Sequence, residues 1–200
     1  MKKKILDRYE QTNEGYVIID VATKRVEDLY EDFDKTAPYH KKDLDEDLVY
    51  YLTECVREIG HSKFVLRFVF EQFPSEQFTL RVRTSIQKFF LYQRELEFTA
   101  MKKMLRTSMI LFTTGIAILF ISLWVEHLIH MAEKEYFLNS VFAEGLTIVA
   151  WVSMWEGLAT LMLNLVPHLY HLKLFRNIAE AQVLFYHPST VYSDNSEDIS

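Results

Sequence analysis

The residue best placed to do chemistry is Glu156, a carboxyl group inside a segment that is otherwise nearly free of charge. Residues 142–165 carry Glu144 near their start and Glu156 well inside, and their other residues are apolar, small or uncharged. An ionised carboxylate near the centre of a bilayer costs at least about 2.5 kcal/mol, so it must be protonated, paired or hydrated. Glu156 is therefore the first candidate for a functional site.

Other polar and small residues share one side of this segment with Glu156. At 100° per residue, an arc of about 100° holds Ser153, Glu156, Gly157, Thr160 and Asn164. Residues 107–125 carry a similar group, namely Thr107, Thr114, Gly115 and Ser122. The two polar faces can meet within one chain or around an oligomer axis. Two roles are then open for Glu156. It can titrate in a pore, or it can stay neutral and hydrogen-bond across helices as a tie between them, and the small residues available for helix packing favour the second role.

Two pairs of histidines have the i, i+3 spacing that places both side chains on one helix face. His127 and His130 can hold a divalent ion, but such pairs are frequent by chance, so we predict neither a metal nor a cofactor. His168 and His171 repeat the spacing beyond the second apolar segment. We expect them to be polar anchors at the membrane boundary, with a pH response as an open alternative.

The sequence offers little that is typical of an enzyme. It has five glycines and one cysteine, and it contains no phosphate-cradling loop, serine elbow or HExxH motif. Cys55 lies on the apolar face of a predicted helix and is expected in the core, and a single cysteine excludes an intrachain disulfide or a cysteine-based zinc site. The net charge of -6 argues against nucleic acid as a partner. We predict a protein that is not an enzyme.

Two long apolar segments position the candidate residues. Residues 107–125 contain no charge and, at 1.5 Å per residue, reach about 28 Å, the thickness of a bilayer core. Residues 142–165 are longer and predict a second span. The mean hydropathy of -0.02 conceals this hairpin because the flanks are highly charged. Basic residues precede the first span and follow the second, namely Lys102, Lys103, Arg106, Lys173 and Arg176. By the positive-inside rule they place both termini in the cytoplasm.

The flanks predict a small α+β domain. Strands are expected at residues 15–22, 63–71 and 181–187, and the last can pair with the sheet built from the N-terminal half. Helices are expected at 43–59, where Asp43 and Glu46 form a capping box, and at 76–106, with a strand at 78–82 as the alternative. A short helix or turn is expected at 23–33, and a break at Pro167.

These assignments divide the chain into four parts. They are a cytoplasmic α+β domain with its lead-in helix (1–106), a transmembrane hairpin (107–166, with spans 107–125 and 142–165), a returning helix and strand (167–187) and a disordered acidic tail (188–200). The predicted fold class is therefore α+β with an integral membrane part, a two-helix hairpin carrying a small α/β-sandwich-like domain. A lead-in helix that continues into the first span would couple the two mechanically.

Three stretches resemble a family of small, uncharacterised bacterial two-span membrane proteins. They are EDLYEDFD (27–34), DLDEDLVYYLTE (43–54) and EGLTIVAWVSMWEGLATLML (144–163), the last similar to an "EGL-I-GWVAMW" signature in the second transmembrane helix. The chain departs from that pattern at Glu156, Gly157 and Ala159. The resemblance implies a multi-pass protein of the bacterial cytoplasmic (inner) membrane and attaches no chemistry to it.

Two functions are compatible with these patterns. The first is a homo-oligomeric membrane assembly, with a pore or gated channel as its candidate role and the lipid bilayer as its first partner. The alternative is a membrane-anchored interaction or scaffold module that recruits a cytoplasmic protein partner.

Overall fold

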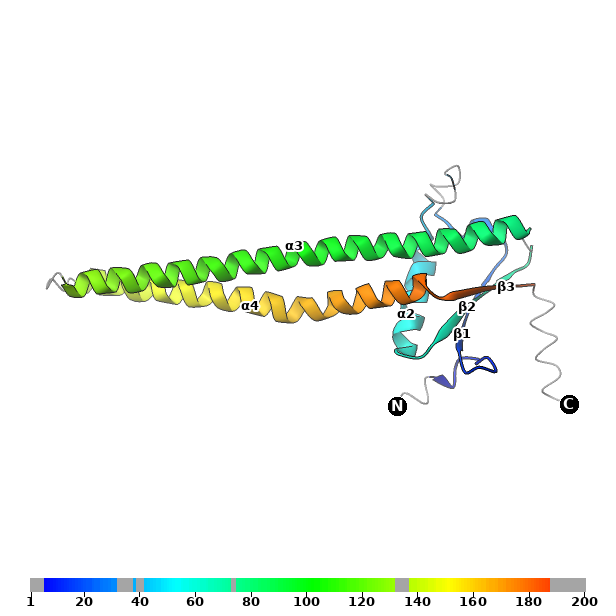
Figure 1. Ribbon diagram of the computed structural model, residues 1–200, viewed down its shortest axis with the longest axis horizontal. Helices are drawn as coiled ribbons and strands as arrows, with labels where there is room; N and C mark the ends of the chain where they lie inside the picture. Colours follow the sequence, from blue (N-terminus) through cyan, green and yellow to red (C-terminus); the bar gives the residue numbers. More distant parts are fainter. Residues whose placement is uncertain (1–5, 32–37, 39–41, 73–74, 132–136, 188–200) are drawn as a thin grey trace. The chain divides into compact units, whose positions relative to one another are not determined.

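The computed structural model describes residues 6–31, 38, 42–72, 75–131 and 137–187 and shows a mixed structure of helices and strands (Figure 1). Its elements, in order, are β1 (Val17–Thr23), the 3-10 helix η1 (Val26–Leu29), α2 (Glu46–Ile59), β2 (Phe64–Phe70), α3 (Glu76–Met131), α4 (Phe137–Ala179) and β3 (Gln182–Tyr186). The predicted acidic tail and part of the connector between the long helices lie outside the described residues.

The chain divides into two compact units. We call Met1–Glu95 with Leu172–Ser200 the sheet unit and Leu96–His171 the hairpin unit. All three strands lie in the sheet unit, where they form a parallel sheet in the order β1-β2-β3. In its register Val17 pairs with Phe64 and Val65 with Gln182. The predicted pairing of the last strand with the N-terminal sheet is confirmed through β2, and the sheet therefore joins segments from both ends of the chain.

One face of the sheet carries the core of the sheet unit. Alternate strand residues turn toward the helices, and among them Ile19, Leu66 and Phe68 are fully buried. They pack with one side of α2, the first turns of α3 and the last turns of α4, through these buried residues: Leu52, Cys55, Val56, Ile59, Val82, Ile86, Phe89, Phe90, Leu174 and Ile178. Cys55 is in the core, as its position on the apolar face predicts.

The start of α2 differs from the prediction. Its N-cap is Asp45, whose side chain accepts hydrogen bonds from the backbone N–H groups of Asp47 and Leu48, and not Asp43. Asp43 is held instead by its backbone, because its carbonyl accepts from Glu31 N at 3.1 Å beside a bridge between Tyr30 and Leu44. In the segment predicted as a short helix or turn, the described residues 23–31 contain η1 with extended residues on either side, and the last two positions lie outside the described residues.

Both long helices continue through positions where the sequence analysis allowed a strand or predicted a break. α3 is helical throughout residues 78–82, so the alternative strand there is wrong, and it runs unbroken through the predicted first span. α4 contains Pro167 inside it, so the predicted break is also wrong. Proline removes one backbone hydrogen bond, and in an apolar helix the neighbouring turns can absorb that loss with a bend rather than an end.

Candidate functional site

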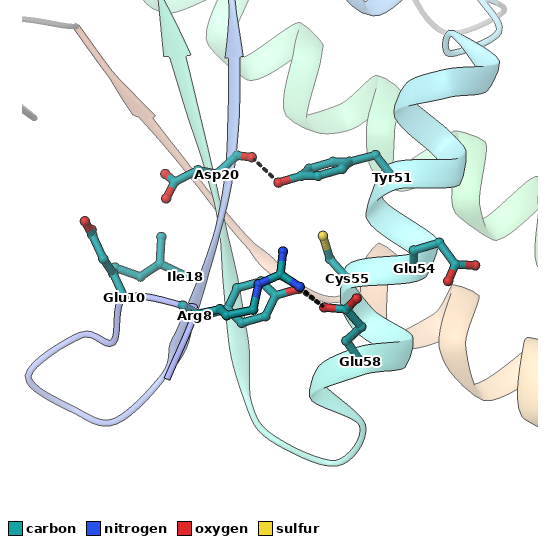
Figure 2. Close-up of a pocket in the computed structure, with 9 residues that line it drawn as sticks. Arg8, Glu10, Ile18, Asp20, Tyr51, Glu54, Cys55 and Glu58 are labelled. Carbon is teal, nitrogen blue, oxygen red and sulfur yellow. Dashed lines mark hydrogen bonds and ion pairs between the residues drawn. The ribbon is translucent and has the colours of Figure 1, made fainter. Parts of the chain in front are cut away.

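A cavity of about 350 Å³ opens in the sheet unit between the N-terminal segment, β1 and α2 (Figure 2). It is lined by Arg8, Tyr9, Glu10, Ile18, Asp20, Tyr51, Glu54, Cys55 and Glu58. The four residues from α2 follow at i, i+3, i+4 and i+7, which is the spacing of one helix face. The core side of this amphipathic helix thus ends in a polar margin that faces the outer edge of β1.

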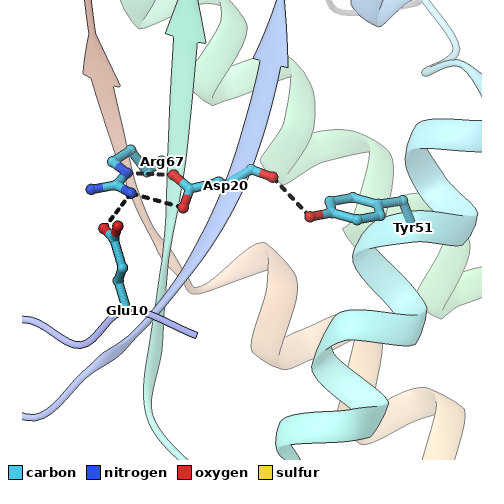
Figure 3. A network of polar contacts seen from close by, with 4 residues as sticks. All are labelled: Glu10, Asp20, Tyr51 and Arg67. Carbon is cyan, nitrogen blue, oxygen red and sulfur yellow. Dashed lines mark hydrogen bonds and ion pairs between the residues drawn. The ribbon is translucent and has the colours of Figure 1, made fainter. Parts of the chain in front are cut away.

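A guanidinium group holds the β1 side of the cavity in place (Figure 3). Arg67 on β2 lies directly opposite Asp20 on β1 in the sheet register. Its Nη2 donates to Asp20 Oδ2 at 2.8 Å and to Glu10 Oε2 at 2.6 Å, and its Nε donates to Asp20 Oδ1. The hydrogen bond to Asp20 raises the pKa of Arg67 above its usual value despite the opposing effect of burial. The network fixes both carboxylates.

Two tyrosines donate hydrogen bonds across the cavity. The hydroxyl of Tyr51 donates to the backbone carbonyl of Asp20 at 2.9 Å, and that of Tyr9 donates to Glu58 Oε2 at 2.7 Å. Burial raises the pKa of Tyr51 to about 12, and burial together with the bond to Glu58 raises the pKa of Tyr9 above its ordinary value. Both phenols are therefore protonated donors at neutral pH.

The raised pKa of Tyr51 predicts an alkaline weakness of the sheet unit. The folded state holds the phenolic proton more tightly than the unfolded chain, so this contribution is complete below pH 10 and is lost as pH rises to about 12. Because Tyr51 is 43% exposed, solvent screening limits the loss to less than about 1 kcal/mol. Urea unfolding midpoints above pH 10 should fall less in Tyr51→Phe than in the wild type. Tyr50→Phe, which alters a residue that is 67% exposed, should behave like the wild type. An equal fall of the midpoint above pH 10 in the two variants would contradict the role given to Tyr51.

In the hairpin unit, α3 and α4 approach each other at small residues. A Cβ atom built on Gly115 would lie 2.9 Å from the Ala150 carbonyl oxygen, and one on Gly157 would lie 3.0 Å from the Ser108 carbonyl oxygen. Further along, the hydroxyls of Ser122 and Thr147 share a hydrogen bond of 2.7 Å. The helices thus pack backbone to backbone, which is typical of helix pairs in membranes.

The residues predicted for the intramembrane stripe occupy different surroundings in this helix pair. Ser122 and Gly157 are buried between the helices, and Ser153 and Thr160 are half-buried. Glu156, Asn164, Thr107 and Thr114 are exposed on the surface of the unit. Within one chain, therefore, the predicted faces meet through Gly115, Gly157 and Ser122, and the carboxyl group of Glu156 lies outside that contact.

The two predicted histidine pairs also lie in different surroundings. His127 is exposed and the side chain of His130 lies outside the described residues, and no group of three metal-binding side chains occurs in the described part of the chain. On α4, His168 Nδ1 lies 2.7 Å from Glu97 Oε1 of α3, and His171 Nδ1 lies 3.5 Å from the same oxygen. Glu97 was missed from the sequence because 71 residues separate it from His168. No periodic pattern could indicate this contact.

The residues around the cavity were also missed, although their chemistry is visible in the sequence. Arg67 interrupts the outer face of an apolar strand, and this is the one local signal that a charged partner must lie opposite. Comparison with known proteins adds no precedent: no family model, curated protein or solved structure matches this chain.

Proposed function

We propose that this is an integral protein of the bacterial cytoplasmic membrane, a two-span hairpin with both termini in the cytoplasm. Two stretches, Glu76–Leu128 and Glu144–Ala179, are long and apolar enough to cross a membrane by length and composition. Only 17% and 11% of their most apolar windows are buried. A core helix of a water-soluble protein buries such a surface, whereas here it faces outward, as lipid contact requires.

We further propose that the hairpins self-associate through the face of α4 that carries Glu156. The observation behind this proposal is that Glu156 remains exposed although α3 and α4 already pack closely through Gly115 and Gly157. The carboxyl group lies about midway along the apolar part of α4, where lipid offers it no hydrogen-bond partner. A second copy that presents the same group would satisfy both, since two carboxyl groups that share protons can bond to each other.

The surroundings of Glu156 favour a tie between subunits over a conducting pore. Its exposed neighbours on the same face are Val149, Val152 and Leu163, at 51%, 62% and 74% exposure. Such a face packs well against a copy of itself but does not attract water. We therefore propose a non-catalytic, membrane-anchored assembly that presents the sheet unit to a cytoplasmic partner. A pore remains the second candidate because a carboxyl group in mid-span, with Ser153 and Thr160 beside it, is also suited to protons or cations.

The test is self-association of the full-length protein in liposomes, measured by energy transfer between differently labelled copies. Glu156→Leu should weaken association by about tenfold, because it removes the hydrogen-bonding carboxyl group and puts an apolar side chain of similar size in its place. Glu156→Gln should retain association, since an amide also hydrogen-bonds. Glu144→Gln changes another exposed acid of the same helix near its start and should have no effect.

Two outcomes would contradict parts of this proposal. Association of Glu156→Leu equal to the wild type would show that Glu156 does not tie the subunits. Proton flux into the same liposomes that is present in the wild type and absent in Glu156→Gln would replace the tie with the pore.

A further inference from the structure

A second cavity of the sheet unit opens between α2 and the parts of α3 and α4 that belong to this unit. We call it the helix groove, and its volume is about 310 Å³. This volume lies at the lower end of the range of about 300–1,000 Å³ for ligand pockets, so the groove suits a single side chain better than a large molecule. It is lined by Leu44, Glu46, Val49, Tyr50, Thr53, Phe89, Gln93 and Phe175.

The apolar lining of the helix groove continues the core of the sheet unit to its surface. Leu44 and Phe89 belong to that core, and Val49 and Phe175 are half-buried against it. Tyr50, in contrast, leaves 67% of its surface exposed beside this hollow. An exposed aromatic ring next to an apolar hollow is typical of the centre of a protein interface, because both can be buried by one partner side chain.

One end of the helix groove carries an acid whose charge is not balanced by its neighbours. Glu46 is the only charged residue in the lining, and its carboxyl group forms no hydrogen bond or ion pair within the described part of the chain. The acids next to it are already used. Asp45 accepts from the backbone N–H groups of Asp47 and Leu48, and Glu31 Oε1 accepts from Glu46 N at 3.1 Å. The groove therefore combines an apolar hollow with a negative charge that is open to a partner.

We propose that the helix groove binds an apolar side chain of a cytoplasmic protein, with a lysine or arginine next to that side chain. The apolar side chain is buried against Phe89 and Tyr50, and the basic group reaches Glu46. Thr53 and Gln93 are uncharged, so the rest of the lining opposes neither contact. The inference rests on the proposed function, in which the sheet unit meets a cytoplasmic partner, and it states the chemistry of that partner.

The charge of Glu46 favours this occupant over two others. A lipid acyl chain would match the apolar lining but leave the carboxylate unpaired, and an anionic headgroup would be repelled by it. A second copy of this chain is a poorer electrostatic match than a basic partner, because the chain carries a net charge of -6. Complementary charge at the margin of an interface selects the partner and speeds its approach.

The test is peptide binding to the full-length protein in nanodiscs of phosphatidylcholine, a lipid without net charge that does not attract basic peptides. The probes are three acetylated and amidated peptides, Ala-Lys-Leu-Lys-Ala, Ala-Glu-Leu-Glu-Ala and Ala-Lys-Ser-Lys-Ala. Their dissociation constants are measured by saturation-transfer NMR on the alanine methyl groups that all three share. Empty nanodiscs give the background.

We expect the lysine–leucine peptide to bind at least about fivefold more tightly than either of the others. Glu46→Gln should weaken its binding by about threefold, the usual effect of one exposed charge pair, whereas Asp47→Asn should change it little. Asp47 is the matched control because it is an exposed acid in the same helical turn but does not line the groove.

The aromatic side of the groove has its own pair of variants. Tyr50→Ala should weaken binding of the lysine–leucine peptide by about fivefold, because one wall of the hollow is removed. Tyr92→Ala alters another tyrosine of the sheet unit, 56% exposed and outside the groove, and should have no effect.

Several results would overturn the proposal. They are no binding of the lysine–leucine peptide, equal binding of the glutamate peptide, and equal binding of the serine peptide. A nuclear Overhauser contact between the lipid acyl chains and the Tyr50 ring would assign the groove to lipid instead, and peptide binding that weakens as the protein is concentrated would assign it to a second copy.

Failure of this inference is distinguishable from failure of the proposed assembly. A protein that associates through Glu156 in liposomes but binds none of the peptides contradicts only the helix groove. A protein that binds the lysine–leucine peptide but associates equally well as Glu156→Leu contradicts only the tie between subunits.

Discussion

Gly115→Ala is expected to loosen the contact between α3 and α4, although alanine is the better helix former. The added Cβ would lie 2.6 Å from Met154 Cγ, 2.9 Å from Met154 N and 2.9 Å from the Ala150 carbonyl oxygen. Backbone atoms cannot move aside as the end of a flexible side chain can, so the helices must separate. We expect a loss of about 1–3 kcal/mol in the free energy of unfolding of the hairpin unit, the usual range for overpacking.

The hairpin unit offers its own controls and its own reporter. Gly145→Ala adds the same methyl group to α4 where nothing lies within 4 Å, and should be neutral or stabilising. Gly157→Ala, with backbone contacts at 3.0 Å, should have an intermediate effect. All three tryptophans, Trp124, Trp151 and Trp155, lie in this unit, so their fluorescence during unfolding in mixed detergent micelles follows it directly. Equal midpoints for Gly115→Ala and Gly145→Ala would show that the helices are not in close contact.

Arg67→Ala is expected to produce the largest loss of stability among the polar variants of the sheet unit. It leaves the carboxylates of Asp20 and Glu10 without their shared partner beside a strand whose other face is core. Removal of one partner of a buried pair costs about 3–5 kcal/mol, but Asp20 and Glu10 are 44% and 50% exposed, so water recovers part of that. We expect a loss of about 2 kcal/mol.

Hydrogen exchange of the β1 and β2 amides measures this loss without interference from the long helices. Protection in both strands should fall in Arg67→Ala. Adding Asp20→Asn should restore part of it, because the orphaned charge is then removed. Arg25→Ala breaks an exposed pair with Asp28 and should change protection by less than about 0.5 kcal/mol. Similar exchange in Arg67→Ala and Arg25→Ala would show that the Arg67 network is only a surface contact.

Regular patterns in the sequence predicted the elements well, and long-range contacts explain where they did not. The alternation in β2 and the one-sided apolar face of α2 are local properties, and both elements are present. The N-cap was misplaced by two residues because Asp43 and Asp45 offer similar local chemistry. A backbone contact with Glu31, and a bridge formed by residues nearby, decided between them.

The candidate sites were predictable only in part, for the same reason. Helical spacing groups Glu156 with Ser153 and Thr160, but it could not indicate which side of α4 would meet α3. That choice was made by the close backbone approach at Gly115 and Gly157. The Arg67 network and the pairing of Tyr9 with Glu58 join residues that are 47 to 57 positions apart, beyond the reach of any periodic pattern.

The position of β3 at the end of the sheet has a consequence for how this protein folds during translation. β2 pairs with β3, which is translated only after both long helices. Until then, β2 presents an open edge, and the core lacks Leu174, Ile178 and Val183. The N-terminal strands therefore stay without this partner strand while the two long apolar helices are synthesised. A chain whose synthesis stalls before β3 would keep that edge exposed. Such an edge makes the incomplete chain prone to aggregation and a target for cellular quality control.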